Sequence, residues 1–328
     1  MQFISRGIGG GGALYSPTIS PHDPDVMFVA CDMSPVFRST DGGVTWEVMP
    51  WEAWTGKHRT PAQFSNATGI LCALDVRTNE GGTSTQPIVS KDGGNTWMRA
   101  QNWMPPTFST GNLATVVIGD PAKSDHFLVA NTNTLASFTW VDQGNGSVNL
   151  VAFITALGGP LQPGININRL AGAFFDGANV FVATDTQFIY AASGLDNTFA
   201  VLSMGMGNNE RVVSFAGGTD GTTIRFYCVT VQGPVGPNDN VSTLYGKPFG
   251  GLYYMDLSIG SLPLASGASL PPWTMLWGGA TNPFGSAQFR VALVAMTGKD
   301  HVAYVAATAP ATDRICLVYR LKPDSAKA

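Results

Sequence analysis

Short apolar runs recur along the whole chain and are separated by turn-forming residues. Each run is rich in Val, Ile, Phe and Tyr and is bounded by Gly, Pro, Asn or Asp, a pattern typical of β-strands. Apolar residues at helical spacing are almost absent. The sequence therefore predicts an all-β chain, with strands over residues 26–30, 70–76, 114–118, 126–131, 179–184, 187–192, 211–215, 223–231, 252–257, 289–296, 301–308 and 314–321.

Two sets of internal repeats indicate how these strands are grouped. The first octet (residues 39–46, STDGGVTW) and the second octet (residues 90–97, SKDGGNTW) are near-copies, and residues 193–199 (SGLDNTF) are a weaker third copy. Similar segments that recur after about as many residues as one small sheet contains predict a repeat architecture such as a propeller. A second element supports this period, because its copies superimpose without gaps: MFVACD at 27–32, HFLVAN at 126–131, VFVATD at 180–185 and, more loosely, VAYVAAT at 302–308.

Each repeat reads as a four-stranded blade. In the first blade we expect an inner strand at 13–20, then strands at 26–31 and 36–39 and an outer strand at 45–49. The last run, 314–321, is a third strand with no outer strand after it, and residues 2–6 can supply that strand and close the ring. Ring closure removes the exposed strand edges of an open sheet. We predict a single β-propeller domain over residues 1–328 with four-stranded blades. The number of blades is six or seven, because the pattern of residues 238–272 is too irregular to assign to blades.

The octets have the composition of a tight hairpin. The carboxylates of Asp41 and Asp92 can accept hydrogen bonds from the backbone of their own turns. The paired glycines permit positive φ where the chain reverses, and the Thr hydroxyl can tie the turn internally. Trp46 and Trp97 can bury a large flat surface between sheets. We therefore expect a structural role for the octets rather than a catalytic one.

Composition narrows the function classes. Of the 328 residues, 44% are hydrophobic and only 12% are charged, and the net charge is −4. No basic stripe is present, so a nucleic-acid partner is not expected. No apolar run reaches membrane-spanning length, and residues 1–12 lack the apolar core of a signal peptide. Low charge with many Gly, Thr, Asn and Ser residues favours an extracellular protein or one on a virion or cell surface.

Metal and cofactor sites are not predicted. The four cysteines lie far apart in apolar runs without a CxxC pair, which favours buried free thiols, although one disulfide stays open. The four histidines are dispersed. The glycine run at 9–12 lacks the strand–loop–helix setting and the Lys-Ser/Thr pair of a phosphate-binding loop.

Residues 8–50 resemble the start of the glycoside hydrolase family 74 xyloglucanases, in which the octet is called an Asp box or BNR repeat. The match is good to about residue 100, and beyond it only the blade rhythm persists. Residues 69–75 (GILCALD) resemble the first strand of the family's second blade. The features that carry the resemblance are, in chain order, the glycine run 9–12, the turn 20–24 (SPHDP), Asp32, the pair Phe37–Arg38 and the first octet.

This resemblance implies an inverting endo-β-1,4-glucanase or xyloglucanase-like hydrolase in which Asp32 is the catalytic base. The sequence departs from the family beside Asp32: Ala30 and Cys31 stand where the family has Arg-Thr, and Ser34 and Pro35 replace a Gly-Gly pair. The family draws its general acid from a second propeller, so a second propeller domain or subunit is an implied partner. An inverting glycosidase needs two carboxyl groups about 6.5–9.5 Å apart. The candidates for the second carboxyl group are Asp75, Glu80 and Glu52.

Substrate contacts are predicted in the connections between blades. Residues 50–61 hold Trp51, Trp54 and Arg59, and an exposed Trp can stack on the apolar C–H face of a sugar ring. The alternative is that both Trp side chains pack over the blade edge. Trp103 lies in the matching connection after the second blade. Asp185 is the repeat counterpart of Asp32, with a polar turn residue as its alternative role.

Two function classes remain open. One is a carbohydrate-active enzyme acting on a polysaccharide. The other is a non-catalytic propeller that binds glycans or has a structural role, for example on a virion or cell surface. Sialidases also carry Asp boxes, but their Arg-Ile-Pro signature near the N-terminus is missing here.

Overall fold

The structure is a computed structural model of the chain. It describes residues 14–20, 22–31, 34–56, 62–79, 82–102, 116–120, 123–130, 135–153, 170–177, 179–191, 200–207, 209–234, 236, 247–265, 267–278, 290–296, 303–308 and 316–321. Two compact units divide the chain, Met1–Gly164 and Ile165–Ala328, and each is described by itself. Whether residues 1–328 form one domain stays a prediction.

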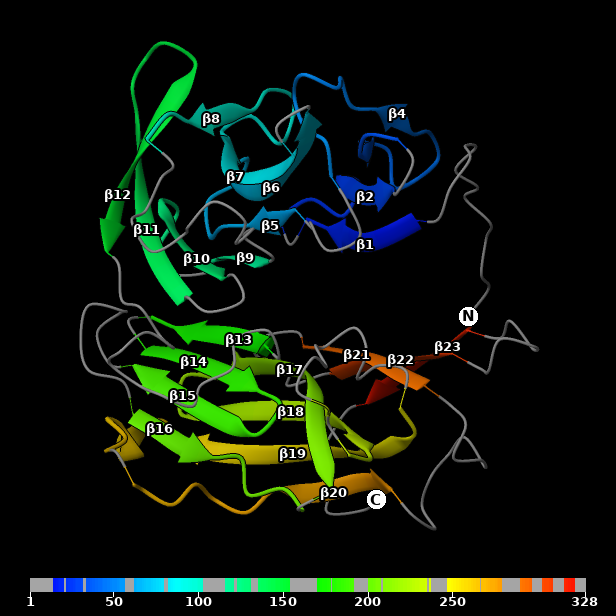
Figure 1. The fold of residues 1–328 in the computed structure, drawn as a ribbon, viewed down its shortest axis with the longest axis vertical. Helices are drawn as coiled ribbons and strands as arrows, with labels where there is room; N and C mark the ends of the chain where they lie inside the picture. Colours follow the sequence, from blue (N-terminus) through cyan, green and yellow to red (C-terminus); the bar gives the residue numbers. More distant parts are fainter. Residues whose placement is uncertain are drawn as a thin grey trace. The chain divides into compact units, whose positions relative to one another are not determined.

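The first unit is built from antiparallel strands in sequential order (Figure 1). Its four-stranded sheet has the order β1-β2-β3-β4, and its eight-stranded sheet consists of two antiparallel four-strand groups joined by a short parallel pairing of β8 with β12. The strands are β1 (Leu14–Ile19), β2 (Met27–Cys31), β3 (Phe37–Ser39), β4 (Glu47–Val48), β5 (Gln63–Phe64), β6 (Leu71–Asn79), β7 (Gly82–Ser90), β8 (Met98–Ala100), β9 (Val116–Gly119), β10 (His126–Ala130), β11 (Leu135–Asp142) and β12 (Ser147–Phe153).

The second unit repeats the same antiparallel order in two four-stranded sheets, β13 to β16 and β17 to β20, and in a three-stranded sheet, β21 to β23 (Figure 1). A short 3-10 helix, η2 (Ile259–Ser261), follows β19. The strands are β13 (Leu170–Asp176), β14 (Asn179–Thr184), β15 (Gln187–Ala191), β16 (Ala200–Ser203), β17 (Glu210–Thr219), β18 (Thr223–Gln232), β19 (Phe249–Ser258), β20 (Thr274–Gly278), β21 (Arg290–Met296), β22 (Ala303–Thr308) and β23 (Cys316–Leu321).

The repeats predicted the strand order within the sheets. The copies of the second repeat element lie in β2, β10, β14 and β22, and each of these is the second strand of its group. One expectation was wrong: residues 69–75 were expected to begin a blade, but β6 is a second strand, because β5 pairs with it through Gln63–Cys72 and Phe64–Leu71. The closing strand at 2–6 and the weak octet copy at 193–199 lie outside the described residues. The blade number stays a prediction.

Both octets form the hydrogen-bonded hairpin that their composition predicted. The Asp41 carboxylate accepts hydrogen bonds from the backbone N–H of Thr45 at 2.9 and 3.0 Å and from its hydroxyl at 2.6 Å. These bonds from Thr45 lower the pKa of Asp41 to about 2. In the second octet, the N–H of Thr96 donates to Asp92 Oδ1 at 2.9 Å and the Thr96 hydroxyl donates to Oδ2 at 2.6 Å. All four octet glycines have positive φ, from 69° to 88°.

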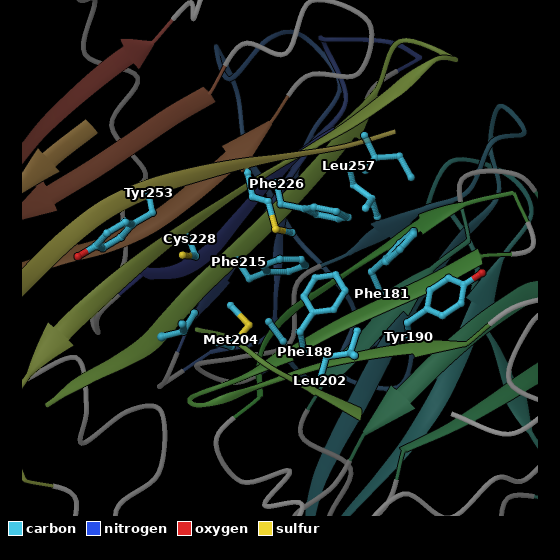
Figure 2. Packing of buried hydrophobic residues seen from close by; sticks show 14 of the residues in the cluster. Phe181, Phe188, Tyr190, Leu202, Met204, Phe215, Phe226, Cys228, Tyr253 and Leu257 are labelled. Carbon is cyan, nitrogen blue, oxygen red and sulfur yellow. The ribbon is translucent and has the colours of Figure 1, made fainter. Parts of the chain in front are cut away.

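Aromatic side chains fill the space between sheets within each unit. In the second unit, Phe215 stacks on Phe226 with centroids 5.3 Å apart and planes at 19°, and Phe226 also meets Phe181 and Phe188 (Figure 2). In the first unit, Phe28 packs beside Trp54 and Trp97. Burial of such side chains contributes about 1.5–3 kcal/mol each, so these clusters are the main source of stability in each unit.

Candidate functional site

The segment after β4 carries both tryptophans that the sequence singled out, and the structure gives them different environments. Trp54 is 1% exposed, packs 4.9 Å from the Trp97 ring, and donates its indole N–H to the Leu74 carbonyl oxygen at 2.9 Å. Trp51 is 55% exposed. The packing alternative therefore applies to Trp54, whereas stacking of Trp51 on a ligand stays a prediction that its exposure allows.

A buried carboxylate lies beneath this segment. Asp75 on β6 is 1% exposed, and its Oδ1 accepts the backbone N–H of Thr55 at 2.9 Å and the hydroxyl of Thr55 at 2.8 Å. Its Oδ2 accepts hydrogen bonds from Arg77 Nε at 2.7 Å and from Arg99 Nη2 at 3.0 Å. Two guanidinium groups thus offset the cost of burying one carboxylate.

The same two arginines hold the backbone on either side of Trp51. Arg77 Nη2 donates to the carbonyl oxygens of Trp51 and Glu52, both at 3.0 Å, and Arg99 Nη2 also donates to Glu52. Each guanidinium therefore bridges the buried Asp75 and the exposed turn. Because Trp54 anchors the other end of the turn, the Trp51 backbone is fixed at several points. We call the group Asp75, Arg77, Arg99 and Thr55 the arginine node.

The arginine node decides what Asp75 can do. Both carboxylate oxygens are occupied by donors and the side chain has no exposed surface, so Asp75 has no face to offer to a substrate. The structure thus favours a structural role for Asp75 over a catalytic one. Glu52 is exposed and contributes its carbonyl oxygen to the node. Asp32, Arg59, Glu80 and Trp103 lie outside the described residues, and their roles stay predictions.

Asp185 is also buried, at 3% exposure. Its Oδ2 lies 3.8 Å from Nε of Arg211, and its backbone oxygen accepts the N–H of Val212 on β17 at 2.9 Å. The residue therefore joins the end of β14 to the next sheet in the second unit. This environment favours the structural alternative for Asp185 over contact with a substrate.

A cavity of about 620 Å³ lies in the second unit, and the sequence did not predict it. Its walls come from residues 201–207, from Glu210 and Tyr253, and from residues 267–273. The last segment falls largely in the stretch whose irregular pattern prevented blade counting, so no sequence pattern predicted this wall. Among the described residues, no group of three His, Cys, Asp or Glu side chains could hold a metal ion, and no helix is long and apolar enough to cross a membrane.

Comparison with solved structures shows the fold class. An ancestral GH74 enzyme aligns with a TM-score of 0.59 and 12% identity over 96% of this chain and 37% of its own. The GH74 xyloglucanase from Xanthomonas campestris aligns at 0.58 and 15% identity over 98% and 45%, respectively. YCF48 bound to the D1 peptide aligns at 0.55 and 13% identity over 95% and 79%.

This chain is a β-propeller. At these identities the likeness shows the fold alone, and the propeller spans less than half the length of the two GH74 proteins. No protein-family model matches the sequence, and neither does any curated protein.

Trp51 could be predicted as a candidate from the sequence of the propeller, because it lies in an aromatic-rich connection between the two octets. The sequence did not predict the arginine node, since Asp75 and Arg77 lie on β6 and Arg99 lies on β8, and these two strands come together only because both pair with β7. Arg99 follows the second octet by two residues, and its neighbour Met98 pairs with Val89 on β7. No local pattern could have joined Arg99 to Asp75.

Proposed function

We propose that this propeller is a carbohydrate-active protein that recognises a polysaccharide chain, with Trp51 as a stacking platform. The observation that carries the proposal is the exposed indole of Trp51 on a turn that the arginine node and the buried Trp54 hold in place. A platform whose backbone is already ordered loses less conformational freedom on binding than a mobile one. The octets are Asp boxes in this proposal.

The finer proposal is hydrolysis of a β-1,4-glucan backbone with inversion, with Asp32 as the base. It is supported by the N-terminal resemblance and by the fold likeness to GH74 proteins. Asp75 is not the acid in this proposal, because Thr55, Arg77 and Arg99 donate hydrogen bonds to both of its carboxylate oxygens. A second propeller domain or subunit supplies the acid in this proposal, and Arg59 and Trp103 contribute further contacts to the chain. The site of action is extracellular or on a cell or virion surface.

A non-catalytic glycan-binding propeller is the second candidate. The ion pairs of Asp75 with Arg77 and Arg99 favour this candidate, because glycan binding requires the Trp51 platform but no free pair of carboxyl groups. The solved structures that align with this chain include YCF48 bound to the D1 peptide, so a similar fold also occurs in a protein that binds a peptide.

Binding is tested first, by isothermal titration calorimetry of the chain with xyloglucan and cello-oligosaccharides. Trp51→Ala is expected to weaken the affinity by about tenfold, equivalent to about 1.4 kcal/mol. Val48→Ala is the matched control, because Val48 is also an exposed apolar residue of the same region, at 54% exposure, yet it offers no aromatic face. Equal loss in both variants, or no loss in either, contradicts the platform.

Turnover is tested separately by release of reducing ends from the same polysaccharides. If the enzyme proposal holds, the protein releases reducing ends and Asp32→Ala abolishes this release. If the chain alone is inactive, the assay is repeated with the second propeller added. Release that is unchanged in Asp32→Ala removes the role proposed for Asp32. Binding that depends on Trp51 without any release establishes the non-catalytic candidate.

A further inference from the structure

The connection between β19 and β20 occupies the place of an octet but has a different form. In the two octet hairpins, Ser39 and Ser90 end the third strand of the sheet, and Trp46 and Trp97 directly precede the outer strand. In the sheet of β17 to β20, the third strand ends at Ser258, and Trp273 directly precedes the outer strand. Residues 258–273 therefore stand where the β3–β4 and β7–β8 hairpins have only an octet.

The longer connection is an ordered structure rather than a slack loop. It begins with η2, where the Ser261 hydroxyl donates to the Ser258 carbonyl oxygen at 2.6 Å, and a further turn is closed by the N–H of Ala268 on the Ala265 oxygen at 3.0 Å. Leu262, Leu264, Leu270 and Trp273 pack against the phenylalanine cluster of the second unit. A simple chain reversal does not require these hydrogen-bonded turns and packed side chains, so we expect the segment to have a further role in the surrounding structure.

That role is to form one wall of the cavity. Residues 267–273 face the chain that leaves β16, and Glu210 and Tyr253 complete the lining. Figure 2 shows Leu202 and Met204 near the phenylalanine cluster, and the Tyr253 ring at its edge with the hydroxyl directed away from it. A volume of about 620 Å³ lies within the range of small-molecule sites, about 300–1,000 Å³.

Glu210 is the one charged side chain among the described residues that line the cavity. The Tyr253 hydroxyl donates to its two oxygens, at 2.8 and 3.0 Å, and within the described part of the chain no cationic side chain pairs with this carboxylate. Burial, together with the bond to Glu210, raises the pKa of Tyr253 well above its ordinary value. Tyr253 therefore remains a neutral donor and leaves the negative charge of the Glu210 carboxylate in place.

The remaining side chains provide an apolar and polarisable surface. Met204 and Met206 contribute thioethers, and Tyr253 and Trp273 contribute aromatic rings. Aromatic faces attract cations, and methionine adapts its shape to apolar groups. A negative charge at the wall of such a cavity is complementary to a positive ligand that also carries an apolar group.

We propose that this cavity binds a small organic cation, with its ammonium group on Glu210 and its apolar body against Met204, Met206, Leu270 and Trp273. This site is independent of the Trp51 platform, which belongs to the other unit of the chain. A neutral ligand of the same shape lacks the charge-assisted hydrogen bond to Glu210, and an anion is repelled by it.

The test is calorimetry of the full chain with three probes of similar shape: 2-phenylethylamine, 2-phenylethanol and 3-phenylpropionate, near neutral pH. We expect the amine to bind at least about tenfold more tightly than the alcohol, as a hydrogen bond to a charged group predicts, and the carboxylate not to bind. Equal affinity for the amine and the alcohol, or no binding of the amine up to about 10 mM, overturns the proposal.

Two variants assign the result to this cavity. Glu210→Gln keeps an oxygen for the Tyr253 hydroxyl but removes the charge, and it is expected to abolish the preference for the amine. Ser269→Trp, at an exposed lining position, fills the cavity without disturbing buried polar groups and is expected to remove binding of both ligands. Glu47→Gln on exposed β4 is the control and leaves binding unchanged. Amine binding that survives both cavity variants places the cation elsewhere and overturns the proposal.

Discussion

At the scale of single residues, Asp75 shows how a buried charge is retained for structure. Replacing it with Asn leaves Arg77 and Arg99 without a counter-charge. Since both arginine side chains are about a third exposed, water screens part of the loss. We expect a decrease of about 2–4 kcal/mol in the free energy of unfolding, measured by urea denaturation.

The control for this prediction is the exposed pair of Asp142 and Lys91. The carboxylate is 31% exposed and the ammonium group 46%, so the pair lies largely in water. Asp142→Asn is expected to leave the free energy of unfolding nearly unchanged, because water screens an exposed ion pair. A loss in Asp75→Asn as small as that of the control would mean that the arginine node does not hold the Trp51 turn.

At the scale of elements, the second octet joins two sheets of the first unit through a glycine. A Cβ built on Gly94 would lie 2.4 Å from Cζ of Phe28, and Phe28 is 1% exposed. Gly93, its neighbour in the same hairpin, has open space around it. Both have positive φ, so the pair separates backbone strain from steric contact.

Gly93→Ala is therefore expected to cost about 1–2 kcal/mol, from the left-handed backbone alone. Gly94→Ala carries the same strain and also displaces Phe28 from its place beside Trp54 and Trp97, for a total of about 2–5 kcal/mol. Urea unfolding of the two variants compares them directly. Equal losses would mean that Phe28 yields without cost, and would contradict the tight contact between octet and core.

The strands differ in how well they could be predicted from the sequence. The second strands were predicted well because they are buried runs such as MFVAC on β2 and NVFVAT on β14. The strand β13 (LAGAFFD) was missed, since it carries no β-branched residue. The structure gives the reason: a Cβ at Gly172 would lie 2.3 Å from the Phe215 backbone oxygen, so close packing of β13 on β17 requires a residue without a side chain.

At the scale of the whole molecule, the sequence predicted the repeats, but it did not predict which residues from distant segments come together in the fold. The octets set the register of their own hairpins, because the hydrogen bonds of their Asp and Thr side chains are local. The arginine node and the lining of the cavity assemble from segments far apart in sequence, and their positions depend on sheet pairing and interlocking side chains. The exposed Trp51 could be predicted as a candidate, whereas its anchoring by Arg77 and Arg99 could not.

The cysteines report on the folding of the entire chain. Cys31, Cys72 and Cys228 are at most 1% exposed. Burial raises the pKa of the Cys72 and Cys228 thiols well above the ordinary value. The reactive form of a thiol is the thiolate, so these groups should react only when the protein opens. We expect labelling by DTNB to be slow in native buffer and immediate in guanidinium, with mass spectrometry identifying each site.

The variant Thr40→Cys supplies the matched exposed thiol, because Thr40 lies at the surface of the first octet. It should react at once under native conditions while the three buried cysteines stay protected. Cys72 lies in the first unit and Cys228 in the second, so their two labelling rates measure the opening of each unit separately. Equal rates across a denaturant series indicate one cooperative fold, as the prediction of a single domain requires, whereas early labelling of one cysteine shows that its unit unfolds alone.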